Sequence, residues 1–537
     1  MITDILKAAL LTNKALAADK PFTTTTFLSA DGTTARTTPA RWADWHNVKE
    51  YGATGNGTTD DTVAIQATID WVNTNPRGTI YFPRGTYKVT SPLTLPLGSG
   101  LISLCLVGEG EASTITGNVN GFIIDRYDPT YNDSFSSTIT VEKLKIINTN
   151  NVSPIVAQFT GTSSGTNLTV SGITGTLAVG DYLIGMGTLP NNARIASQTS
   201  GTPGGNGVYV TTVSTAVSGA DITAWRQAVV NGAIRLGTTQ FTAVRDCTLS
   251  GVMCALYNED DLIGIYGQCG PNPGSNAFNC SSFPFEVMNV KFLPVAGGIV
   301  PGSFAIATGN QGVMSNCDID GFDNGICSIG PGNYILGGII KNCNYGVRTG
   351  TDGLGHGQNM AMVIRGTQFI NNNIAGFNVS GQGVFSNITV IGNGGQYGIY
   401  TAGGGASELC TFISCLVSGS FSVAAIILED FPAQHAENAS YNVFIGCNAS
   451  NSGAGVAWQM PLNAPSAQFI NSNNPAAQFA FTTLPDLSAG TAPEIGDEFL
   501  VSNSPTATSG NFATVVTVGG GSNHVKLRWN GTGWMIV

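Results

Sequence analysis

Three aspartates lie within six residues in the segment CDIDGFD, at positions 318, 320 and 323. If the apolar residues between them face a core, Asp318 and Asp320 point outward from one strand, about 6.5–7 Å apart along the backbone. Two carboxylates can serve as the acid and the base of glycoside hydrolysis, and their separation decides between retention and inversion. A solvated strand face would give the same pattern. We predict Asp318 and Asp320 as one pair of catalytic candidates.

A second group of candidates lies in and around two long segments, TDGLGHGQNM (351–360) and DFPAQHAENASY (430–441), which contain two of the four histidines. An alignment of repeats, described below, ends two strands at Gly350 and Glu429, so both segments leave the same edge of a repeat array. Two such walls would form a groove for an extended glycan, although polar loops without a ligand remain the alternative. Here we predict His356, Glu429 and Asp430 as catalytic, and Arg348, Asp352, Tyr400, His435, Glu437 and Trp458 as substrate-binding.

The chemistry of this second group stays open between hydrolysis and elimination. Arg348 could neutralise a uronate or act as the base of a lyase. Tyr400 and Trp458 could stack on sugar rings, but burial in the wall explains them equally well. Gly355-His356-Gly357 is similar to the Gly-His-Gly motif of polygalacturonases, yet the aspartate pair that accompanies it in that family is missing.

The composition limits the classes of protein to which the chain can belong. Only 10% of the 537 residues are charged, against about 25% usually, and the 70 glycines are about double the common share. Hydrophobic residues still reach 42%, which is enough for a large core. A net charge of −11 without a basic cluster argues against nucleic-acid binding, and no stretch approaches the ~18 apolar residues of a membrane-spanning helix. We predict an all-β chain.

The eleven cysteines are scattered and never form the C-x-x-C pairs typical of zinc sites. We therefore predict that most are small buried hydrophobic residues. A disulfide between Cys269 and Cys280, which flank a Gly/Pro/Asn loop, is an open alternative. No metal and no cofactor is predicted.

Short strands that carry a Gly-apolar or Ala-apolar pair recur along the second half of the chain. The pairs begin at Gly325, Gly346, Gly376, Gly398, Ala425 and Gly455, in steps of 21, 30, 22, 27 and 30 residues. This spacing predicts a solenoid with a coil of 21 or 22 residues and loops inserted in some coils. Asn342, Asn372 and Asn393 are then expected at equivalent turn positions, as in the amide ladders of stacked strands.

A set of short motifs between residues 46 and 110 points in the same direction. In order they are Tyr51-Gly52-Ala53, Gly55-Asn56-Gly57, Thr59-Asp60-Asp61, Ala64-Ile65-Gln66, Phe82-Pro83, Gly85-Thr86-Tyr87 and Gly108-Glu109-Gly110. Together they resemble the opening of the pectate-lyase-like superfamily, which includes phage tailspikes that depolymerise polysaccharides. The resemblance implies a right-handed parallel β-helix with a capped start, and structural roles for Asp60 and Asp61. We expect a helix after Gly57, with Thr58 and Thr59 as its N-caps.

These patterns divide the chain into four parts. We predict a right-handed parallel β-helix at 45–157 and 227–485, a small β module inserted at 158–226 and a small β domain at 486–537. The Ser/Thr/Gly-rich module could bind carbohydrate or a receptor, or be a decoration without a ligand. The resemblance implies that the last domain caps the open end of the solenoid and makes the chain a trimer.

Residues 1–44 complete the functional prediction. Asp4, Lys7 and Lys14 fit a signal peptide poorly, so we expect a segment that attaches to a phage tail or baseplate. The whole is predicted to be a homotrimeric tailspike of the virion, acting outside the host cell, that binds and hydrolyses bacterial surface polysaccharide. No nucleic acid and no membrane insertion is predicted. A receptor-binding spike without activity and a polysaccharide lyase, including a free bacterial enzyme, stay open as alternatives.

Overall fold

The computed structural model describes most of the chain between Trp45 and Gln459 and some short stretches outside this range. The described residues are 26–27, 36–37, 45–74, 77–96, 103–126, 138–153, 155–185, 189, 193–226, 231–236, 241–252, 254–258, 285–295, 298–308, 312–328, 332–349, 362–379, 383–401, 410–428, 442–459, 468–470, 472, 498–504, 523–529 and 534–536.

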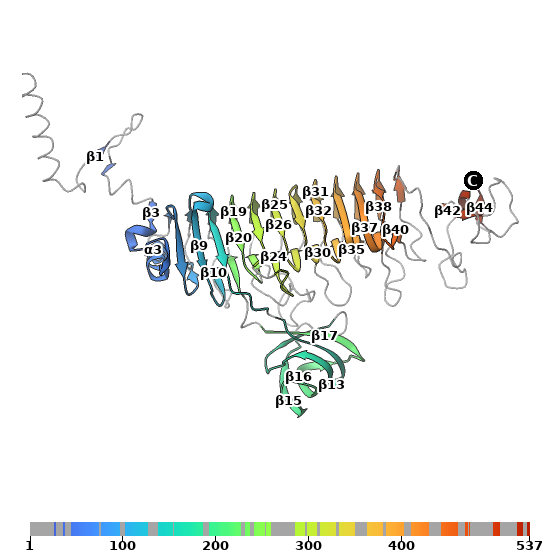
Figure 1. Ribbon diagram of the computed structural model, residues 1–537, viewed down its shortest axis with the longest axis horizontal. Coiled ribbons are helices and arrows are strands. Elements are labelled where there is room, and N and C mark those ends of the chain that lie inside the picture. Colours follow the sequence, from blue (N-terminus) through green and yellow to red (C-terminus); the bar gives the residue numbers. More distant parts are fainter. Residues whose placement is uncertain are drawn as a thin grey trace, which may run out of the picture.

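The main body is a solenoid whose successive coils lie side by side, with strands on three faces (Figure 1). Face 1 is a parallel sheet of thirteen described strands. They are β3 (Trp45–Asn47), β5 (Arg77–Tyr81), β8 (Ser103–Val107), β11 (Thr138–Glu142), β19 (Phe241–Arg245), β22 (Phe285–Met288), β25 (Gly312–Ser315), β28 (Tyr334–Leu336), β31 (Met362–Arg365), β34 (Gly383–Ser386), β36 (Cys410–Ile413), β38 (Val443–Ile445) and β41 (Gln468–Ile470).

Faces 2 and 3 belong to one sheet of twenty-one described strands, which bends from one face to the other where β35 (Thr389–Thr401) and β37 (Leu416–Leu428) run through both. Face 2 also contains β4 (Asn56–Asp60), β6 (Gly85–Val89), β9 (Ser113–Gly117), β12 (Lys145–Asn148), β20 (Thr248–Ser250), β23 (Lys291–Leu293), β26 (Asp318–Asp320), β29 (Ile339–Lys341), β32 (Gln368–Ile370) and β39 (Asn448–Ala449). Face 3 also contains β7 (Leu93–Thr94), β10 (Phe122–Arg126), β18 (Gly232–Leu236), β21 (Cys254–Asn258), β24 (Phe304–Thr308), β27 (Asn324–Ser328), β30 (Tyr345–Thr349), β33 (Ala375–Val379) and β40 (Val456–Gln459).

The register of face 1 gives the length of a coil. Val313 pairs with Tyr334 and Val363 pairs with Val384, and both steps are 21 residues. Between Tyr334 and Val363 the step is 29 residues, because the connection from face 3 back to face 1 is longer there. The predicted parallel β-helix, with a short basic coil and inserted loops, is confirmed.

The turn from face 1 to face 2 has the same length along most of the solenoid. Two residues separate the strands in every described coil from β11–β12 to β38–β39, and we call this edge the two-residue corner. The first of the two has a left-handed backbone, with φ of 52–55° at Lys143, Asp246, Asn289, Asn316, Asn387 and Ser414 and with glycine at Gly337, Gly366 and Gly446. Glycine and asparagine adopt this conformation at the lowest cost, which explains their frequency here.

Two asparagines share one register at the corner between faces 2 and 3, but they do not form the predicted set, and the equivalent residue of the following coil is Gly392 and not Asn393. Asn342 and Asn371 both have left-handed backbones and both donate their N–H to the next coil, to Ile370 and Ile391. Asn342 therefore corresponds to Asn371 and not to Asn372. The prediction was wrong by one residue, because a run of consecutive asparagines does not identify the member that turns the chain.

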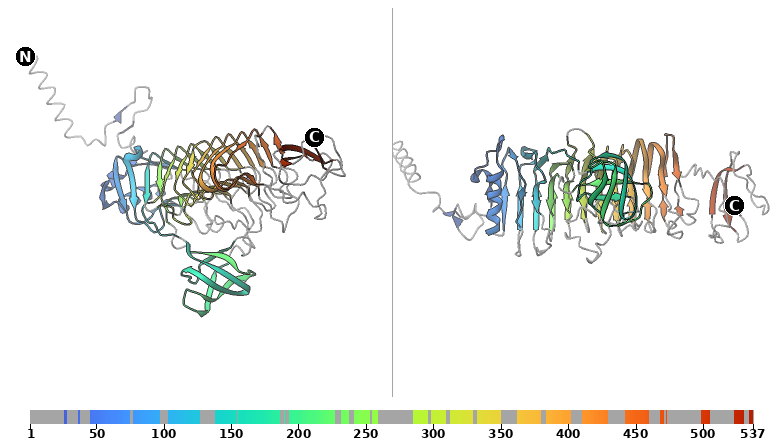
Figure 2. Two further views of the ribbon diagram at one scale, coloured as in Figure 1. Left: turned by 45° about the vertical axis from the view of Figure 1, so that its right-hand side comes forward. Right: turned by 90° about the horizontal axis from the view of Figure 1, so that it is seen from below.

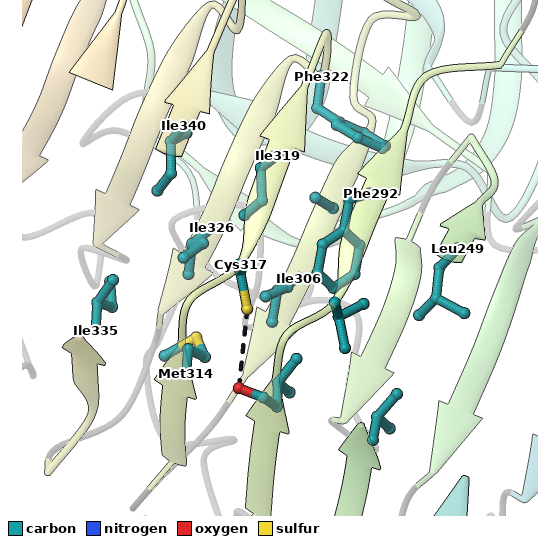
Figure 3. Packing of buried hydrophobic residues seen from close by; sticks show 14 of the residues in the cluster. Leu249, Phe292, Ile306, Met314, Cys317, Ile319, Phe322, Ile326, Ile335 and Ile340 are labelled. Atoms are coloured by element: carbon teal, nitrogen blue, oxygen red, sulfur yellow. Dashed lines mark hydrogen bonds between the residues drawn. The ribbon is translucent and has the colours of Figure 1, made fainter. Parts of the chain in front are cut away.

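Inward-pointing side chains from all three faces form one continuous hydrophobic core. Figure 3 shows Met314 of face 1, Ile319 of face 2 and Ile326 of face 3 meeting inside a single coil. In the C-terminal coils the core residues are aromatic and stack along the solenoid axis. The ring of Phe412 lies 4.9 Å from that of Phe385 and 4.6 Å from that of Phe444.

Of the eight cysteines whose side chains are described, seven are buried, as predicted. Several follow the left-handed residue of the two-residue corner and donate their thiol to a backbone carbonyl. The Cys317 thiol, for example, lies 3.8 Å from the carbonyl oxygen of Val287 (Figure 3). Burial raises the pKa of Cys317 to about 12, so the thiol stays protonated and unreactive. Cys269 and Cys280 lie outside the described residues.

Four glycines of the predicted repeat lie side by side on face 3. Gly325, Gly346, Gly376 and Gly398 occupy successive strands, and a Cβ on any of them would lie 2.1–2.6 Å from the carbonyl oxygen of the next coil. Glycine is therefore required by the close approach of neighbouring strands. The last predicted member, Gly455, is wrong by two residues, because Ala424 pairs with Val456 and so Ala425 aligns with Ala457.

A short helix covers the N-terminal end of the core. It is α3 (Thr62–Thr74), which follows η2 (Val48–Tyr51), and its Ile65 and Ile69 are fully buried (Figure 1). Thr58 and Thr59 lie in β4 and not at the helix start. The helix begins later than predicted because the Asp60 carboxylate accepts the N–H of Thr62, 3.0 Å away.

Asp61 is buried and holds the preceding turn. Its two carboxylate oxygens accept the N–H groups of Thr54 and Gly55 at 2.7 and 3.0 Å. Both aspartates of the opening motif thus have structural partners.

The inserted module is an antiparallel sheet that projects from the side of the solenoid (Figures 1 and 2). In spatial order its strands are β14 (Tyr182–Gly185), β17 (Ala220–Trp225), β13 (Ile155–Gly175), β16 (Gly207–Thr215) and β15 (Ile195–Gly201), around a core of their own. The first strand begins at Ile155, before the predicted boundary at 158. The two ends of the insertion meet where the Asn231 amide donates to Asn150, 3.1 Å away.

The C-terminal β domain contains an antiparallel sheet of β42 (Glu498–Ser504), β43 (Asn523–Trp529) and β44 (Trp534–Ile536). The fourth strand predicted there lies outside the described residues. Near the N-terminus, β1 (Thr26–Phe27) pairs antiparallel with β2 (Arg36–Thr37). Within the described part of the chain, no helix has the length and apolar character needed to cross a membrane.

Candidate glycan-binding platform and acidic pair

The acidic pair lies on β26, on the outer surface of face 2. Asp318 and Asp320 point outward with side-chain exposures of 41% and 35%, and Ile319 between them is buried. The ammonium group of Lys341, on the next coil, lies 3.0 Å from the Asp318 carboxylate and 3.8 Å from that of Asp320. The Asn342 amide donates to Asp320 at 2.7 Å.

This network restricts what the acidic pair can do. The hydrogen bond to Asp318 raises the pKa of Lys341, so the ammonium keeps its charge. A glycosidase acid must deliver a proton, whereas each of these carboxylates already accepts a hydrogen bond from a neighbouring coil. The arrangement is that of surface ion pairs between coils, each contributing about 0–1 kcal/mol.

Three polar side chains form a second arrangement, on face 3. Arg348 of β30 pairs with Asn378 of β33, which in turn pairs with Tyr400 of β35. All three are half-buried and alternate with fully buried core residues, so they point outward. Because neighbouring strands lie about 4.8 Å apart, the row is about 10 Å long. We call these three residues the face 3 platform.

Two further tyrosines support the platform. The guanidinium of Arg348 lies 5.0 Å from the ring centre of Tyr345, and the rings of Tyr397 and Tyr400 are 5.0 Å apart. Asn378, Tyr345 and Tyr397 were missed by the sequence analysis. Asn378 could have been found, because aligning the strands on their glycines places it between Arg348 and Tyr400.

The ends of the platform strands show where the two long segments start. Thr349, Val379, Thr401 and Leu428 occupy one row at the last position of their strands in four coils. The strands that precede segments 350–361 and 429–441 therefore end at the same edge, next to the platform. The predicted site residues within these segments lie outside the described residues; they are Asp352, His356, Glu429, Asp430, His435 and Glu437.

Trp458 does not lie on a sugar-binding surface. Its side chain is only 4% exposed and is part of the hydrophobic core. The ring packs edge-on against Phe444, with centres 5.1 Å apart. Its assignment to substrate binding is corrected, because Trp458 occupies an inward position next to Ile426.

The acidic pair and the platform lie on different faces and are not brought together. The corner between them carries a row of hydrogen-bonded side chains, in which Asn373 donates to Asn344 at 3.0 Å and Asn344 donates to Asp323 at 2.7 Å. Asp323 also accepts the N–H of Gly302 at 2.7 Å and so holds the corner. Among the described residues, no three His, Cys, Asp or Glu side chains are grouped so as to hold a metal ion.

The fold and its capped start define a parallel β-helix. Residues 45–272 match the family described as rhamnogalacturonase A/epimerase, pectate lyase-like. This segment, somewhat less than half of the chain, has the sequence characteristics of that family, as the opening motifs predicted.

Sequence relatives of known name match only part of the chain. Alginate lyase 7 of Azotobacter vinelandii is 40% identical over 79 residues, which are 14% of this chain and 9% of the relative. Mannuronan C5-epimerase AlgE3 of the same organism is 34% identical over 105 residues, 18% of this chain and 6% of the relative. The matches thus span less than a tenth of either relative's own length.

Among solved structures, the tailspike protein gp49 of Pseudomonas phage LKA1 resembles the chain with a TM-score of 0.35 and 13% identity. The likeness covers 80% of this chain and 78% of the tailspike.

Proposed function

We propose that the protein binds a bacterial surface polysaccharide along face 3 and cleaves it by hydrolysis. The observation that supports this most is the face 3 platform, a cation, an amide and an aromatic ring in register on three successive coils. The platform lies at the edge from which the two long acidic and histidine-containing segments start. An extended glycan running along the solenoid axis would contact all three side chains.

Each platform residue has a chemical role in this proposal. The guanidinium of Arg348 donates several hydrogen bonds in one plane, which suits carboxylate and hydroxyl groups of sugars. The amide of Asn378 both donates and accepts hydrogen bonds. The half-buried ring of Tyr400 offers an apolar face and a hydroxyl group.

The catalytic groups are proposed to come from the segments and not from the acidic pair. Glu429 and Asp430 directly follow the end of β37, one coil from Tyr400 in register, and His356 follows β30 by a few residues. Two carboxylates there would supply the acid and the base of hydrolysis. Asp318 and Asp320 lie on another face and are engaged by Lys341 and Asn342.

The biological setting is proposed to be a phage tailspike. The capped β-helix, the small C-terminal sheet and the segment 1–44 support an assignment in which the N-terminus attaches to the tail and the chain is a homotrimer. Action would then be extracellular, at the host surface. A spike that binds its receptor without cleaving it would have the same architecture.

A lyase is the second candidate, because two observations favour it. Arg348 presents an outward guanidinium that could hold the carboxylate of a uronate. The partial sequence relatives are named alginate lyase and mannuronan C5-epimerase. A uronate polymer as the substrate would account for both observations.

The test is to incubate the purified chain with a panel of bacterial surface polysaccharides and alginate, following new reducing ends and the absorbance of unsaturated uronate together. Reducing ends alone are expected for the hydrolase. A simultaneous rise in absorbance would replace it by the lyase. Binding without either signal would leave a receptor-binding spike and refute the enzyme.

Variants assign the residues in the same assay. Glu429→Gln and Asp430→Asn should abolish cleavage but keep binding, whereas Asp320→Asn should leave cleavage unchanged. Arg348→Ala and Tyr400→Ala should weaken binding by at least tenfold. Arg365→Ala, which removes an exposed arginine from face 1, is the matched control.

A further inference from the structure

The second residue of the two-residue corner is buried wherever it has a side chain, and these residues form a column along the solenoid axis. In chain order the column contains Leu144, Cys247, Val290, Cys317, Gly338, Thr367, Ile388, Cys415 and Cys447. Cys247 and Cys317 have leucine, valine or glycine as their neighbours in the column. Within the described coils, Cys415 and Cys447 are the one pair of cysteines that follow each other directly.

The backbone holds these two cysteines in adjacent positions. β36 pairs with β38 just before the corner, and β37 pairs with β39 just after it. The N–H of Asn448 donates to the carbonyl oxygen of Cys415, 2.8 Å away. Neighbouring strands are about 4.8 Å apart, and a disulfide can join residues whose Cα atoms are about 4.4–6.8 Å apart. The positions of Cys415 and Cys447 therefore allow a bond between the coils.

The directions of the side chains bring one sulfur toward the other coil. The Cys447 Sγ lies 3.4 Å from the carbonyl oxygen of Phe412, so it leans toward the coil that contains Cys415. The Cys415 Sγ lies 3.5 Å from the carbonyl oxygen of Phe385, in the coil before its own. A bond therefore requires the Cys415 sulfur to turn back toward Cys447, which is a change in one side-chain torsion.

The two thiols influence each other's ionisation. Hydrogen bonding from Cys415 lowers the pKa of Cys447, whereas the same interaction, and then burial, raises the pKa of Cys415. Cys317 occupies the same corner position without a sulfur neighbour, and burial raises its pKa to about 12 (Figure 3). Because the thiolate is the reactive form of cysteine, Cys447 is the member of the pair that can act as the nucleophile.

We propose that Cys415 and Cys447 form a disulfide between consecutive coils when the protein is exposed to a peroxide. The Cys447 thiolate attacks one oxygen of hydrogen peroxide, the O–O bond breaks, and a sulfenic acid forms at Cys447 while hydroxide leaves and takes up a proton. The Cys415 sulfur then attacks the Cys447 sulfur, the S–O bond breaks, and the oxygen leaves as water with the Cys415 proton. The two thiols lose two electrons, and the peroxide is reduced to two molecules of water.

The bond would close a covalent loop around β37, segment 429–441 and β38. Cys415 directly precedes β37 and Cys447 follows β38 by two residues, and Figure 1 shows the two strands near the C-terminal end of the solenoid. Closing a loop stabilises the folded state mainly by restricting the unfolded chain. The two strands that carry the acidic segment would thus be fixed to each other. Only the value of this for catalysis rests on the proposed function; the bond itself does not.

The experiment maps the bond by mass spectrometry of the full chain. The reduced protein is treated with hydrogen peroxide, the remaining thiols are alkylated in denaturant, and the chain is digested with a protease that cuts after glutamate. Cuts after Glu429 and Glu437 separate the two cysteines, which then lie in peptides 409–429 and 438–494. We expect these peptides to be joined until a reductant is added, and Cys317 to be recovered alkylated.

Variants identify the partner, because peptide 409–429 also contains Cys410. Cys415→Val should abolish the joined peptides, and Cys410→Ala is the matched control that should keep them. Valine suits the site because Val290 occupies the same position of the column. Cys447→Val is the second probe if circular dichroism shows that Cys415→Val is not folded. Peroxide should raise the melting temperature of the wild type by several degrees, and Cys415→Val should lose this shift.

Three results would overturn the inference. They are recovery of both thiols alkylated after peroxide treatment, oxidation of Cys447 to a sulfinic acid without a cross-link, and joined peptides that persist in Cys415→Val. The peptide map requires neither a glycan nor cleavage activity. Failure of the proposed function in the polysaccharide assay is therefore distinguishable from failure of the disulfide.

Discussion

Among the four glycines in register on the platform face, Gly346 lies closest to the backbone of the next coil. A Cβ there would lie 2.1 Å from the carbonyl oxygen of Gly376 and 2.7 Å from the ring of Phe369. The oxygen belongs to the backbone of the next strand and cannot move without disturbing the sheet. We expect Gly346→Ala to destabilise the chain by about 2–3 kcal/mol, the upper range of overpacking, measured as a lower melting temperature.

The matched control is Gly366→Asn at the two-residue corner. Gly366 has a φ of 69° with open space around its Cβ position, and the next coil has Asn387 there with a φ of 52°. The substitution should leave the melting temperature almost unchanged. Equal losses in both variants would show that coil contact at Gly346 is not the cause.

Two exposed carboxylates predict how stability responds to acid. Hydrogen bonds from Thr62 and then Thr90 lower the pKa of Asp60, and Thr248 and then Lys145 lower the pKa of Glu111. A lowered pKa in the folded state means that stabilisation is complete above the usual carboxyl pKa of about 4 and is lost as the pH falls through the folded value. We therefore expect the melting temperature to fall as the pH is lowered from about 5 into the strongly acidic range. Asp60→Asn combined with Glu111→Gln should flatten the drop, and an unchanged profile would contradict the assignment.

Individual residues differ in how far the sequence identifies their role. Val384 and Trp458 are both apolar residues of short strands, yet one is exposed and the other is in the core. Strand alternation settles this only when the register is known, and a shift of one residue exchanges inside and outside. Asn342 was aligned with Asn372 for this reason. By contrast, Asp318 and Asp320 flank a buried isoleucine and were correctly predicted to point outward.

Among the elements, the inserted module is expected to be removable. Asn148 and Asn150 before it hydrogen-bond to Gly232 and Asn231 after it, so the solenoid is closed beneath the insertion. The module also has its own core. Replacing residues 154–229 by a short Gly/Ser linker should leave the melting transition of the β-helix within a few degrees of the wild type.

The measurement is differential scanning calorimetry of both proteins, with reducing-end assays on the same samples. We expect the shortened chain to lose one unfolding transition, that of the module, and to keep the others. Aggregation of the shortened chain, or a collapse of the main transition, would show that the module supports the solenoid. Retained cleavage would also place the glycan site outside the module.

The strands were easier to predict than the connections. The four glycines in register on face 3 and the 21-residue coil could be predicted, because backbone contact and strand geometry repeat from coil to coil. The start of α3 was misplaced because capping depends on Asp60, a side chain whose partner is set by the three-dimensional turn. Glu429 and His356 belong to segments without a repeat, so no periodic argument positions them.

At the scale of the whole molecule, the two halves of the solenoid are stabilised differently. The N-terminal coils carry ion pairs between strands, such as Arg235–Asp125 at 2.7 Å and Arg245–Glu286 at 2.9 Å. The C-terminal coils carry stacked phenylalanine rings. Because the Debye length falls to about 3 Å at 1 M salt, surface ion pairs weaken while apolar packing does not.

Hydrogen exchange followed by mass spectrometry checks this difference. In 1 M NaCl, exchange in β11, β19 and β22 should become a few-fold faster than in low salt, corresponding to pairs worth about 0–1 kcal/mol each. Exchange in β34, β36 and β38 should stay constant or slow down. Arg245→Met should remove most of the salt response of β19, and a uniform response along the chain would refute the division.

The unequal corners of the solenoid also have a consequence for the gene that encodes it. Codons added or lost at the return connections from face 3 to face 1 alter a loop and leave every ladder hydrogen bond in place. One codon added within a strand would exchange inside and outside for the rest of that strand, and one added at the two-residue corner would break the left-handed turn. Length variation among descendants of this sequence should therefore collect beside the platform, where it would change which ligand fits while the scaffold stays the same.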